Sequence, residues 1–461
     1  MKTIRDPDQL LSDGLAAIRG QFKVPTGFAP EVEAAAQAAV RRRPDEHKDR
    51  TGEPFITLDP ASSTDLDQAF TIEAAGGDLL LHYAIADVAW FVRDGDPLDV
   101  AAWARGETLY LPDGKAGLYP KTLSEGAASL LPDGPRPAVV FTTRVAPDGA
   151  VKLEGAERAI IRNRAKLAYE TATEAELPAG FAQLSRRITD AEAARGAARV
   201  DPPEQEVERA ADGHFNLLLR PQSLAEQRNA ALSLATNLAV ADALYAAKTG
   251  LFRVMAGPDH RAIARLRHIA DALGLSWPER ESLEAFSKTL DPAQPNAAAF
   301  MLAIRRAGNG ASYVPYQEGV KPWHAAMAAT YCHMTAPLRR LADRYVVRAA
   351  LAVANGQPVP DEATAAFARL GPVMGKADAR ANQIDRAVIE LAEAATLSGR
   401  EGESFAAVVT EVDEVGPRIQ LCDLPVVARV TAHGVAPGTK LTVRLVAADP
   451  VKRTISFERI A

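Results

Sequence analysis

The spacing of hydrophobic and polar positions changes along the chain and predicts a helical start, a sheet-rich middle and a helical continuation. In residues 1–50 the apolar positions recur at helical spacing, which predicts a small helical extension. From Phe55 the pattern becomes that of strands, and a Gly-Gly-Asp turn at 76–78 predicts a hairpin within a larger sheet. Residues 138–170 continue as strands, and after about residue 180 Ala-rich helices follow. Strands first and helices later are typical of the α+β class.

The last part of the chain has a third pattern. From about Glu403, short runs of alternating apolar and polar residues are separated by Gly and Pro turns, and five such runs fit into about 60 residues. A small closed barrel of the OB type is the commonest module of this kind. We therefore expect a helical extension at 1–50, a mixed sheet-plus-helix core at 51–400 and a five-stranded barrel at 401–461.

Cysteine usage and hydropathy bear on the compartment. Cys332 and Cys422 are 90 residues apart and have no partners at zinc-like spacing, so neither a disulfide framework nor a structural zinc site is predicted. The first residues are charged where a signal peptide needs an apolar core, and no run of about 18 uncharged apolar residues occurs. The sequence predicts a cytoplasmic protein that is neither secreted nor membrane-spanning.

The charge balance limits how the protein could hold nucleic acid. The formal net charge is −6, whereas proteins that coat nucleic acid non-specifically usually present a broad basic surface. That class is therefore disfavoured. A narrow channel lined by a few arginines remains compatible with an acidic chain.

The stretch TLDPASSTDLDQAF places Asp59, Asp65 and Asp67 within nine positions. Three interpretations compete: a solvated turn capped by Asp and Ser side chains, a calcium loop, and a magnesium-dependent phosphodiesterase centre. The calcium loop fails because the glycine and glutamate of the EF-hand pattern are missing. Carboxylates this close cannot all stay ionised without a compensating cation. Asp65 and Asp67 point to one face of an extended chain, and Asp59 can return across the intervening loop.

Four motifs in order then resemble the RNase II/RNase R exoribonuclease family, which is defined by the RNB catalytic domain. They are TLDPASSTDLDQAF followed by LHYAIADVAWFV, TLYLPDGKAGLYPKTLSEGAASLLPDGPRPAV at 108–139, IIRNRAKLAYE at 160–170, and HAAMAATYCHMTAPLRRLADRYVVRAAL at 324–351. The resemblance covers roughly residues 50–400. It implies a 3′ to 5′ hydrolytic exoribonuclease that acts on single-stranded RNA and releases nucleoside 5′-monophosphates with magnesium. The terminal barrel is similar to the OB-type RNA-binding domain of such chains, and the N-terminal extension is a candidate RNA-binding module.

The resemblance also assigns the acidic residues. The family's acidic motif has four aspartates; Asp59, Asp65 and Asp67 match the first three, and Gln68 stands in the fourth place. Gln offers a carbonyl oxygen to magnesium but no negative charge, so weaker metal binding is predicted. Asp67 occupies the position that the family treats as essential for cleavage. A second departure lies at Ala230 and Ala231, where relatives commonly carry a Glu pair.

The segment TAPLRR supplies the predicted phosphate contacts. Thr335 is suited to cap a helix that has Pro337 in its first turn, which would place Arg339 and Arg340 near the positive end of that helix. Spacing alone favours an ordinary surface ion pair between Arg339 and Asp343. The resemblance instead assigns Arg339 to the scissile phosphate, where it would stabilise transition-state charge, and Arg340 to the substrate.

Tyr110, in TLYLP, matches the tyrosine that stacks on the terminal base in the family, a contact that accepts any base. A core position is the alternative for a tyrosine in a strand. The second aromatic of the family's base sandwich falls near Val200, where this chain has no ring. His82, His324 and His333 are interpreted as structural residues.

Two rival functions stay open. A catalytically silent RNA-binding or scaffold protein is favoured by Gln68 and Ala231, and disfavoured by the joint presence of Asp67, Arg339 and Tyr110. A magnesium-dependent DNA exonuclease is the weaker rival. The main interpretation predicts a cytoplasmic monomer that acts on single-stranded RNA, with no membrane contact and no obligatory protein partner.

Overall fold

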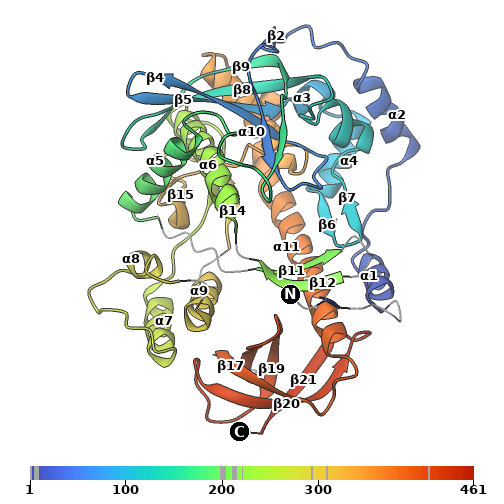
Figure 1. Cartoon of the computed structure of the whole chain (residues 1–461). Helices are drawn as coiled ribbons and strands as arrows, with labels where there is room; N and C mark the ends of the chain where they lie inside the picture. Colours follow the sequence, from blue (N-terminus) through green and yellow to red (C-terminus); the bar gives the residue numbers. More distant parts are fainter. Residues whose placement is uncertain are drawn as a thin grey trace.

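The computed structural model describes residues 3–4, 10–197, 204–209, 215–220, 222–291, 294–307, 310–413 and 416–460 (Figure 1). Residues 1–2 and 5–9 of the predicted N-terminal extension lie outside the described residues, as does Val200.

A five-stranded sheet forms the upper layer of the core (Figure 1). Its strand order is β2 (Lys48–Asp49), β9 (Val151–Arg162), β8 (Pro135–Val145), β5 (Asp78–Ala86) and β4 (Gln68–Ala75). All neighbours are antiparallel except β2 and β9. The predicted hairpin is confirmed as β4–β5, and the strand pattern after residue 138 becomes β8 and β9.

Helices pack against this sheet and extend below it. Those that contact the sheet or each other beside it are α5 (Phe181–Ala194), α6 (Leu224–Ala246) and α10 (Leu341–Ala354). The others are α1 (Leu10–Gln21), α2 (Pro30–Ala39), α3 (Val88–Phe91), α4 (Pro97–Arg105), α7 (His260–Ala272), α8 (Leu283–Ser287), α9 (Pro295–Ala307) and α11 (Asp361–Leu397). Short helical turns of other types cover Leu123–Ala127 and Ala325–Met327. The predicted helical N-terminal region is confirmed as α1 and α2.

Short strands outside the five-stranded sheet form two-stranded pairs and one three-stranded sheet. They are β3 (Thr57–Asp59) with β10 (Lys166–Ala168), β6 (Leu109–Leu111) with β7 (Gly114–Ala116), β13 (Leu251–Val254) with β14 (Ser312–Pro315), β15 (Trp323–His324) with β16 (Ala329–Thr330), and β12 (Phe215–Arg220) between β1 (Thr3–Ile4) and β11 (Glu204–Arg209).

The C-terminal part is a closed barrel, which confirms the fold predicted from its alternating pattern. The strands β17 (Ser404–Asp413), β18 (Gly416–Leu421), β19 (Val427–Thr431), β20 (Lys440–Asp449) and β21 (Thr454–Arg459) close in the order β17-β18-β19-β21-β20. Alternate residues point inward, as Ile419 and Leu421 do in β18.

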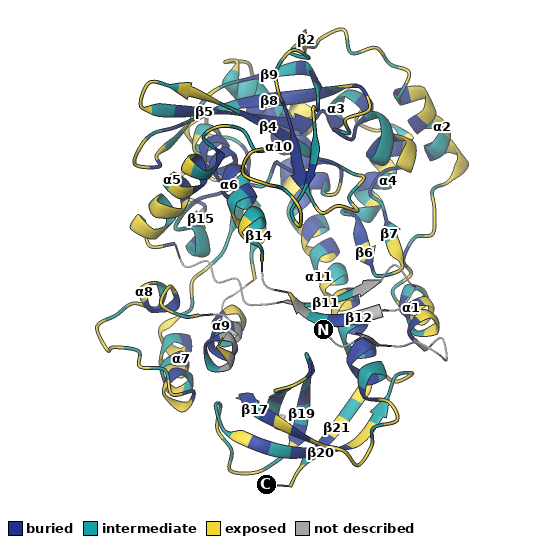
Figure 2. Cartoon of the chain, viewed as in Figure 1, coloured by how far each residue is buried: buried dark blue, intermediate teal, exposed yellow. Residues whose placement is uncertain are grey.

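The long helix α11 belongs to both halves of the molecule. Phe367, Leu370 and Met374 are buried in the core beneath the sheet. Further along the helix, Leu391 and Leu397 belong to a second core that includes the barrel and α1. Figure 2 shows buried positions recurring along the whole helix down to the barrel. One helix therefore joins the core beneath the sheet to the barrel.

Glu393 holds the C-terminal end of α11 against neighbouring strands. Its Oε1 accepts hydrogen bonds from Gln205 Nε2 at 2.6 Å and from the Val427 N–H at 2.7 Å. Burial raises the pKa of this carboxyl to about 7. The contact ties α11 to β11 and to the first residue of β19.

In the described part of the chain, no helix is both long and apolar enough to cross a membrane. Cys332 is a buried free thiol, and Cys422 is exposed and free.

A buried ion pair holds α4 against α10. The Arg344 side chain has no solvent exposure and pairs with Asp99, which also accepts hydrogen bonds from the Gly95 N–H at 2.8 Å and the Tyr345 hydroxyl at 3.0 Å. The Trp103 indole donates to the same hydroxyl at 2.8 Å. Removing one partner of such a pair leaves the other charge buried without compensation.

We expect Asp99→Ala to lower the free energy of unfolding of the core by about 3 kcal/mol, because the Arg344 guanidinium would lose its counter-charge. Urea unfolding followed by tryptophan fluorescence measures this, since Trp103 lies in the same cluster. The matched control is Asp94→Ala, which removes an exposed pair with Arg348 and should cost less than about 1 kcal/mol. Equal losses in the two variants would contradict a structural role for the buried pair.

Candidate active site

The acidic stretch is the connection between β3, which ends at Asp59, and β4, which begins at Gln68. Ser129 closes this loop: its Oγ accepts from the Leu66 N–H at 2.9 Å and donates to the Thr64 carbonyl at 2.7 Å. Lys166 Nζ donates to two further carbonyls of the loop. These hydrogen bonds hold the three aspartates along the wall of a cavity of about 760 Å³, which we call the acidic-loop pocket.

Asp67 is the most buried of the predicted site carboxylates, with 4% exposure. Its Oδ1 accepts a hydrogen bond from the Leu338 N–H at 2.7 Å, and its Oδ2 lies 3.3 Å from Arg339 Nε. Burial raises the pKa of Asp67 to about 7, although Arg339 and the Leu338 N–H act in the opposite direction. The structure thus brings the two predicted catalytic residues, Asp67 and Arg339, into direct contact.

The other predicted metal ligands line the same pocket but differ in their partners. Asp59 Oδ2 is buried and lacks a hydrogen-bond partner, and burial raises the pKa of this carboxyl to about 6. Asp65 accepts from Lys115 Nζ at 2.7 Å and from the Tyr110 hydroxyl at 3.0 Å. Gln68 Oε1 accepts from the Tyr83 hydroxyl at 2.7 Å.

The donor set fits a hard divalent cation. Two buried carboxyls with raised pKa values, one of them with an unpartnered oxygen, are electrostatically undercompensated, and a bound divalent cation would supply the missing positive charge. Among the residues that the structure describes, three or more His, Cys, Asp or Glu side chains do not converge on one point as ligands of a bound metal do. The ion pair between Asp65 and Lys115 keeps one of the three carboxylates engaged elsewhere.

The predicted helix cap at Thr335 is wrong. The helix α10 begins only at Leu341, and the Thr335 hydroxyl contacts Ser233 Oγ at 3.0 Å. Asp343, in the first turn of α10, instead accepts from the Ala336 N–H at 2.8 Å. This bond and Pro337, which disfavours helical backbone at the residue before it, keep the segment ahead of α10 in a turn.

The alternative of an Arg339–Asp343 surface pair is also wrong. Asp343 is fully buried and pairs with Arg340, whose Nη2 lies 2.7 Å from Asp343 Oδ2. Arg339 is half exposed and contacts Asp67 instead. The two adjacent arginines therefore have different surroundings, and only Arg339 reaches the acidic-loop pocket.

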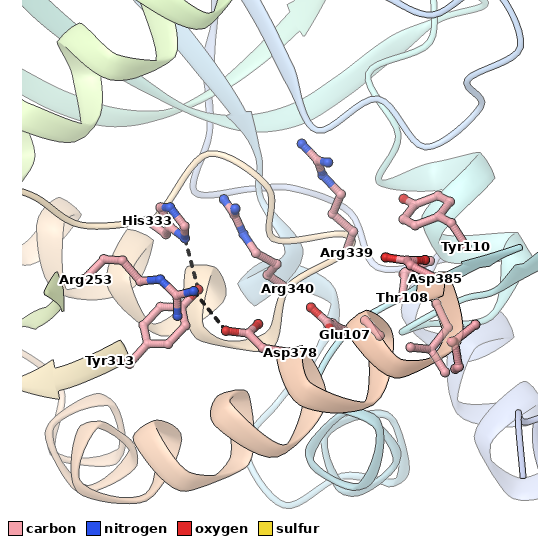
Figure 3. Close-up of a pocket in the computed structure, with 13 residues that line it drawn as sticks. Glu107, Thr108, Tyr110, Arg253, Tyr313, His333, Arg339, Arg340, Asp378 and Asp385 are labelled. Carbon is pink, nitrogen blue, oxygen red and sulfur yellow. Dashed lines mark hydrogen bonds and ion pairs between the residues drawn. The ribbon is translucent and has the colours of Figure 1, made fainter. Parts of the chain in front are cut away.

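Tyr110 projects from β6 with 48% exposure, so it is not a core residue. Its ring and the Arg339 guanidinium line the acidic-loop pocket and also a second cavity of about 340 Å³. We call this cavity the α11 pocket because α11 forms its floor (Figure 3). Arg340 and His333 line the α11 pocket alone.

Several residues of the two pockets escaped the sequence reasoning. Lys115 bridges Asp65 at 2.7 Å and Glu125 at 3.3 Å. In the α11 pocket, Asp378 and Asp385 are seven residues apart on α11 and so share one face of the helix, a spacing that was available as a signal. Glu107 lines the same pocket (Figure 3).

Comparison with known proteins places this geometry in a family. Residues 47–355 match the RNB domain, and residues 403–460 match the RNase II-type exonuclease C-terminal S1 domain. The chain is 26% identical over 431 residues to Ribonuclease R of Aquifex aeolicus, covering 87% of this chain and 60% of that protein. It is 27% identical over 412 residues to Ribonuclease R of Escherichia coli, covering 80% of this chain and 49% of that protein. The chain thus spans about half to three fifths of the length of these curated relatives.

Solved structures share the fold. Mycoplasma genitalium RNase R in its apo form matches with a TM-score of 0.85 at 19% identity, covering 100% of this chain and 79% of that chain. The yeast pseudonuclease Ssd1 matches with a TM-score of 0.71 at 17% identity, covering 96% of this chain and 57% of that chain. Because the RNB match alone extends over more than half of its residues, this chain belongs to the RNB domain family of RNase II and RNase R.

Proposed function

We propose that the protein is a magnesium-dependent 3′ to 5′ exoribonuclease that hydrolyses single-stranded RNA to nucleoside 5′-monophosphates. The contact between the buried Asp67 carboxyl and Arg339, at the wall of a carboxylate-lined cavity, carries this proposal. A phosphodiester bond is cleaved when a water is positioned on one side and the charge on the phosphate oxygens is balanced on the other. RNB-domain exoribonucleases depend on a divalent metal, which agrees with the undercompensated carboxyls.

The roles of the chain's own residues follow from their surroundings. Asp59, Asp65 and Asp67, with Gln68 through its carbonyl oxygen, would hold magnesium. When bound, the metal supplies positive charge that activates water and stabilises the leaving oxygen. Asp67 would position the attacking water and accept its proton at Oδ2. Arg339, half exposed above that oxygen, would stabilise the charge on the scissile phosphate.

Substrate contacts are assigned on the same basis. The exposed ring of Tyr110 would stack on the terminal base, a contact that tolerates any sequence. Arg340, neutralised by Asp343, would act from the α11 pocket rather than as a free phosphate-binding cation. Mycoplasma genitalium RNase R has been solved with ribose-methylated single-stranded RNA and with double-stranded RNA, which supports RNA as the substrate class.

Each of the three regions of the chain has its own role in this proposal. Residues 1–50 form a helical module that can contribute to RNA binding, residues 51–400 the exoribonuclease domain, and residues 401–461 an RNA-binding barrel. We propose that the protein works as a cytoplasmic monomer.

A catalytically silent RNA-binding protein is the second candidate. The engagement of Gln68 by Tyr83 and of Asp65 by Lys115 favours it, since both contacts compete with metal binding. The likeness of the fold to the pseudonuclease Ssd1 shows that this architecture also occurs in a protein named for lacking nuclease activity.

The role of Asp67 is tested by Asp67→Asn. This variant should lower the rate of degradation of 5′-labelled single-stranded RNA in magnesium by about a hundredfold or more, because the water loses its positioning carboxylate. Gel analysis of a time course shows whether products shorten from the 3′ end. The control is Asp78→Asn, which removes a carboxylate paired with Arg144 at the start of β5 and should leave the rate unchanged. Intact RNA in every lane, with RNA binding preserved, would favour the silent protein.

Gln68→Asp tests the fourth ligand position. An additional carboxylate should lower the magnesium concentration needed for half-maximal rate by about threefold or more. A companion variant, Tyr83→Phe, frees Gln68 Oε1 from its hydroxyl partner and should shift the magnesium dependence in the same direction, but less. An unchanged magnesium midpoint in Gln68→Asp would remove Gln68 from the metal site.

Arg339→Lys separates catalysis from binding. Lysine keeps the charge but loses the planar fork of donors, so the turnover rate should fall by about a hundredfold with little change in RNA affinity. Single-turnover kinetics and fluorescence anisotropy measure the two quantities. Arg348→Lys, in an ion pair with Asp94 away from both pockets, is the matched control. Turnover equal to the wild type would remove Arg339 from the reaction.

A further inference from the structure

The α11 pocket lies beside the acidic-loop pocket and shares two of its residues, Tyr110 and Arg339. At about 340 Å³ it is in the size range of sites for small molecules. Figure 3 shows α11 running beneath the pocket and carrying Asp378 and Asp385 along its floor. A pocket of this size, closed below by a helix, suits one nucleoside rather than a continuing RNA strand.

Backbone pairing fixes Glu107 in this pocket. The Thr108 N–H donates to the Arg339 carbonyl at 2.9 Å, and the Leu341 N–H donates to the Gly106 carbonyl at 2.9 Å, so Glu107 lies opposite Arg340. Gly106 allows this approach, because its φ is +77° and a Cβ there would lie 2.7 Å from Ala377 Cβ on α11. The chain at Gly106 is therefore packed closely against the helix that forms the pocket floor, and Glu107 follows directly after it.

The polar groups of the pocket leave an acceptor and a donor without partners. Glu107 Oε1 is buried and makes no hydrogen bond, and burial, with Asp378 nearby, raises the pKa of this carboxyl to about 7. Arg253 Nη1 is also buried without a partner, while Nη2 of the same guanidinium lies 2.9 Å from Asp378 Oδ2. A ligand that both donates and accepts hydrogen bonds would satisfy the two groups.

The charges of the pocket favour a neutral ligand over an anion. Each of its three guanidinium groups is matched by a carboxylate: Arg253 by Asp378, Arg340 by Asp343 and Arg339 by Asp67. Glu107 adds a carboxyl to these three pairs, and Asp385 lies on the same floor. A phosphate in the pocket would meet like charge in a partly desolvated space, whereas hydroxyl groups would not.

We propose that Glu107 is a specificity-determining residue that selects RNA ending in a free 2′,3′-diol and rejects RNA ending in a 3′-phosphate. This inference rests on the proposed function, with the scissile phosphate at Arg339 and the terminal nucleoside in the α11 pocket. One hydroxyl of the terminal ribose donates to Glu107 Oε1, and Arg253 Nη1 donates to a ribose oxygen. A 3′-phosphate at the same place faces the Glu107 carboxylate.

The test compares two single-stranded RNAs of identical sequence, 5′-labelled, one with a 3′-hydroxyl and one with a 3′-phosphate. First-cleavage rates are measured at pH 8, where the Glu107 carboxyl is ionised, for the wild type, Glu107→Gln and Glu107→Ala. We expect the wild type to prefer the 3′-hydroxyl by about tenfold or more, since like charges disfavour a wrong ligand. Glu107→Gln keeps an acceptor without the charge, so the preference should fall about fivefold or more, and the 3′-hydroxyl rate should fall less than it does in Glu107→Ala. Glu107→Ala should lose the preference and also lower the 3′-hydroxyl rate.

A control variant separates this role from a general loss of negative charge near α11. Glu390→Gln removes a carboxylate of α11 that pairs with Arg386 and should retain the wild-type ratio of the two rates. Equal wild-type rates on both RNAs, or an unchanged ratio in both Glu107 variants, would overturn the inference while leaving the proposed function intact. A wild type that degrades neither RNA would overturn the proposed function and this inference together.

Discussion

The carboxyl group of Asp67 is the constraint around which the site is assembled. A carboxyl with 4% exposure must find partners inside the protein, and it finds them in the Leu338 N–H and the Arg339 guanidinium. This contact joins the acidic loop ahead of β4 to the turn ahead of α10. The turn is secured independently by Asp343 from within α10, and α10 is held to α4 by the buried Arg344–Asp99 pair. Each buried charge thus fixes the next element along the path to the site.

The sequence predicts local patterns well because they depend on neighbouring residues alone. The β4–β5 hairpin follows from alternation and a glycine turn, and the barrel follows from repeated short strands. The loop with Asp59, Asp65 and Asp67 could be identified because its charges are crowded within one short stretch. These features require no knowledge of what packs against them.

The wrong predictions concern contacts that depend on distant or competing partners. A helix cap at Thr335 was reasonable from its spacing to Pro337, but Asp343 reaches back to Ala336 and the hydroxyl finds Ser233 on α6. The spacing of Arg339 and Asp343 suggested a pair, yet Arg340 takes that carboxylate because Asp67 lies beside Arg339. A functional role for Glu107 could not be predicted from the residues around it in the sequence, because α11, hundreds of residues later in the chain, forms its surroundings.

The helix α11 forms the floor of the α11 pocket and also packs against the barrel, so it links the two directly. Between Asp385 in the pocket and Glu393 at the joint with β19 the helix is continuous, so each residue sets a fixed angle and rise between them. One inserted or deleted residue would turn the barrel by about 100° relative to the pocket and shift it by about 1.5 Å. Two full turns, about seven residues, would restore the orientation at a greater distance. Insertions or deletions between Asp385 and Glu393 therefore keep the orientation of the barrel relative to the pocket only when they add or remove whole helical turns.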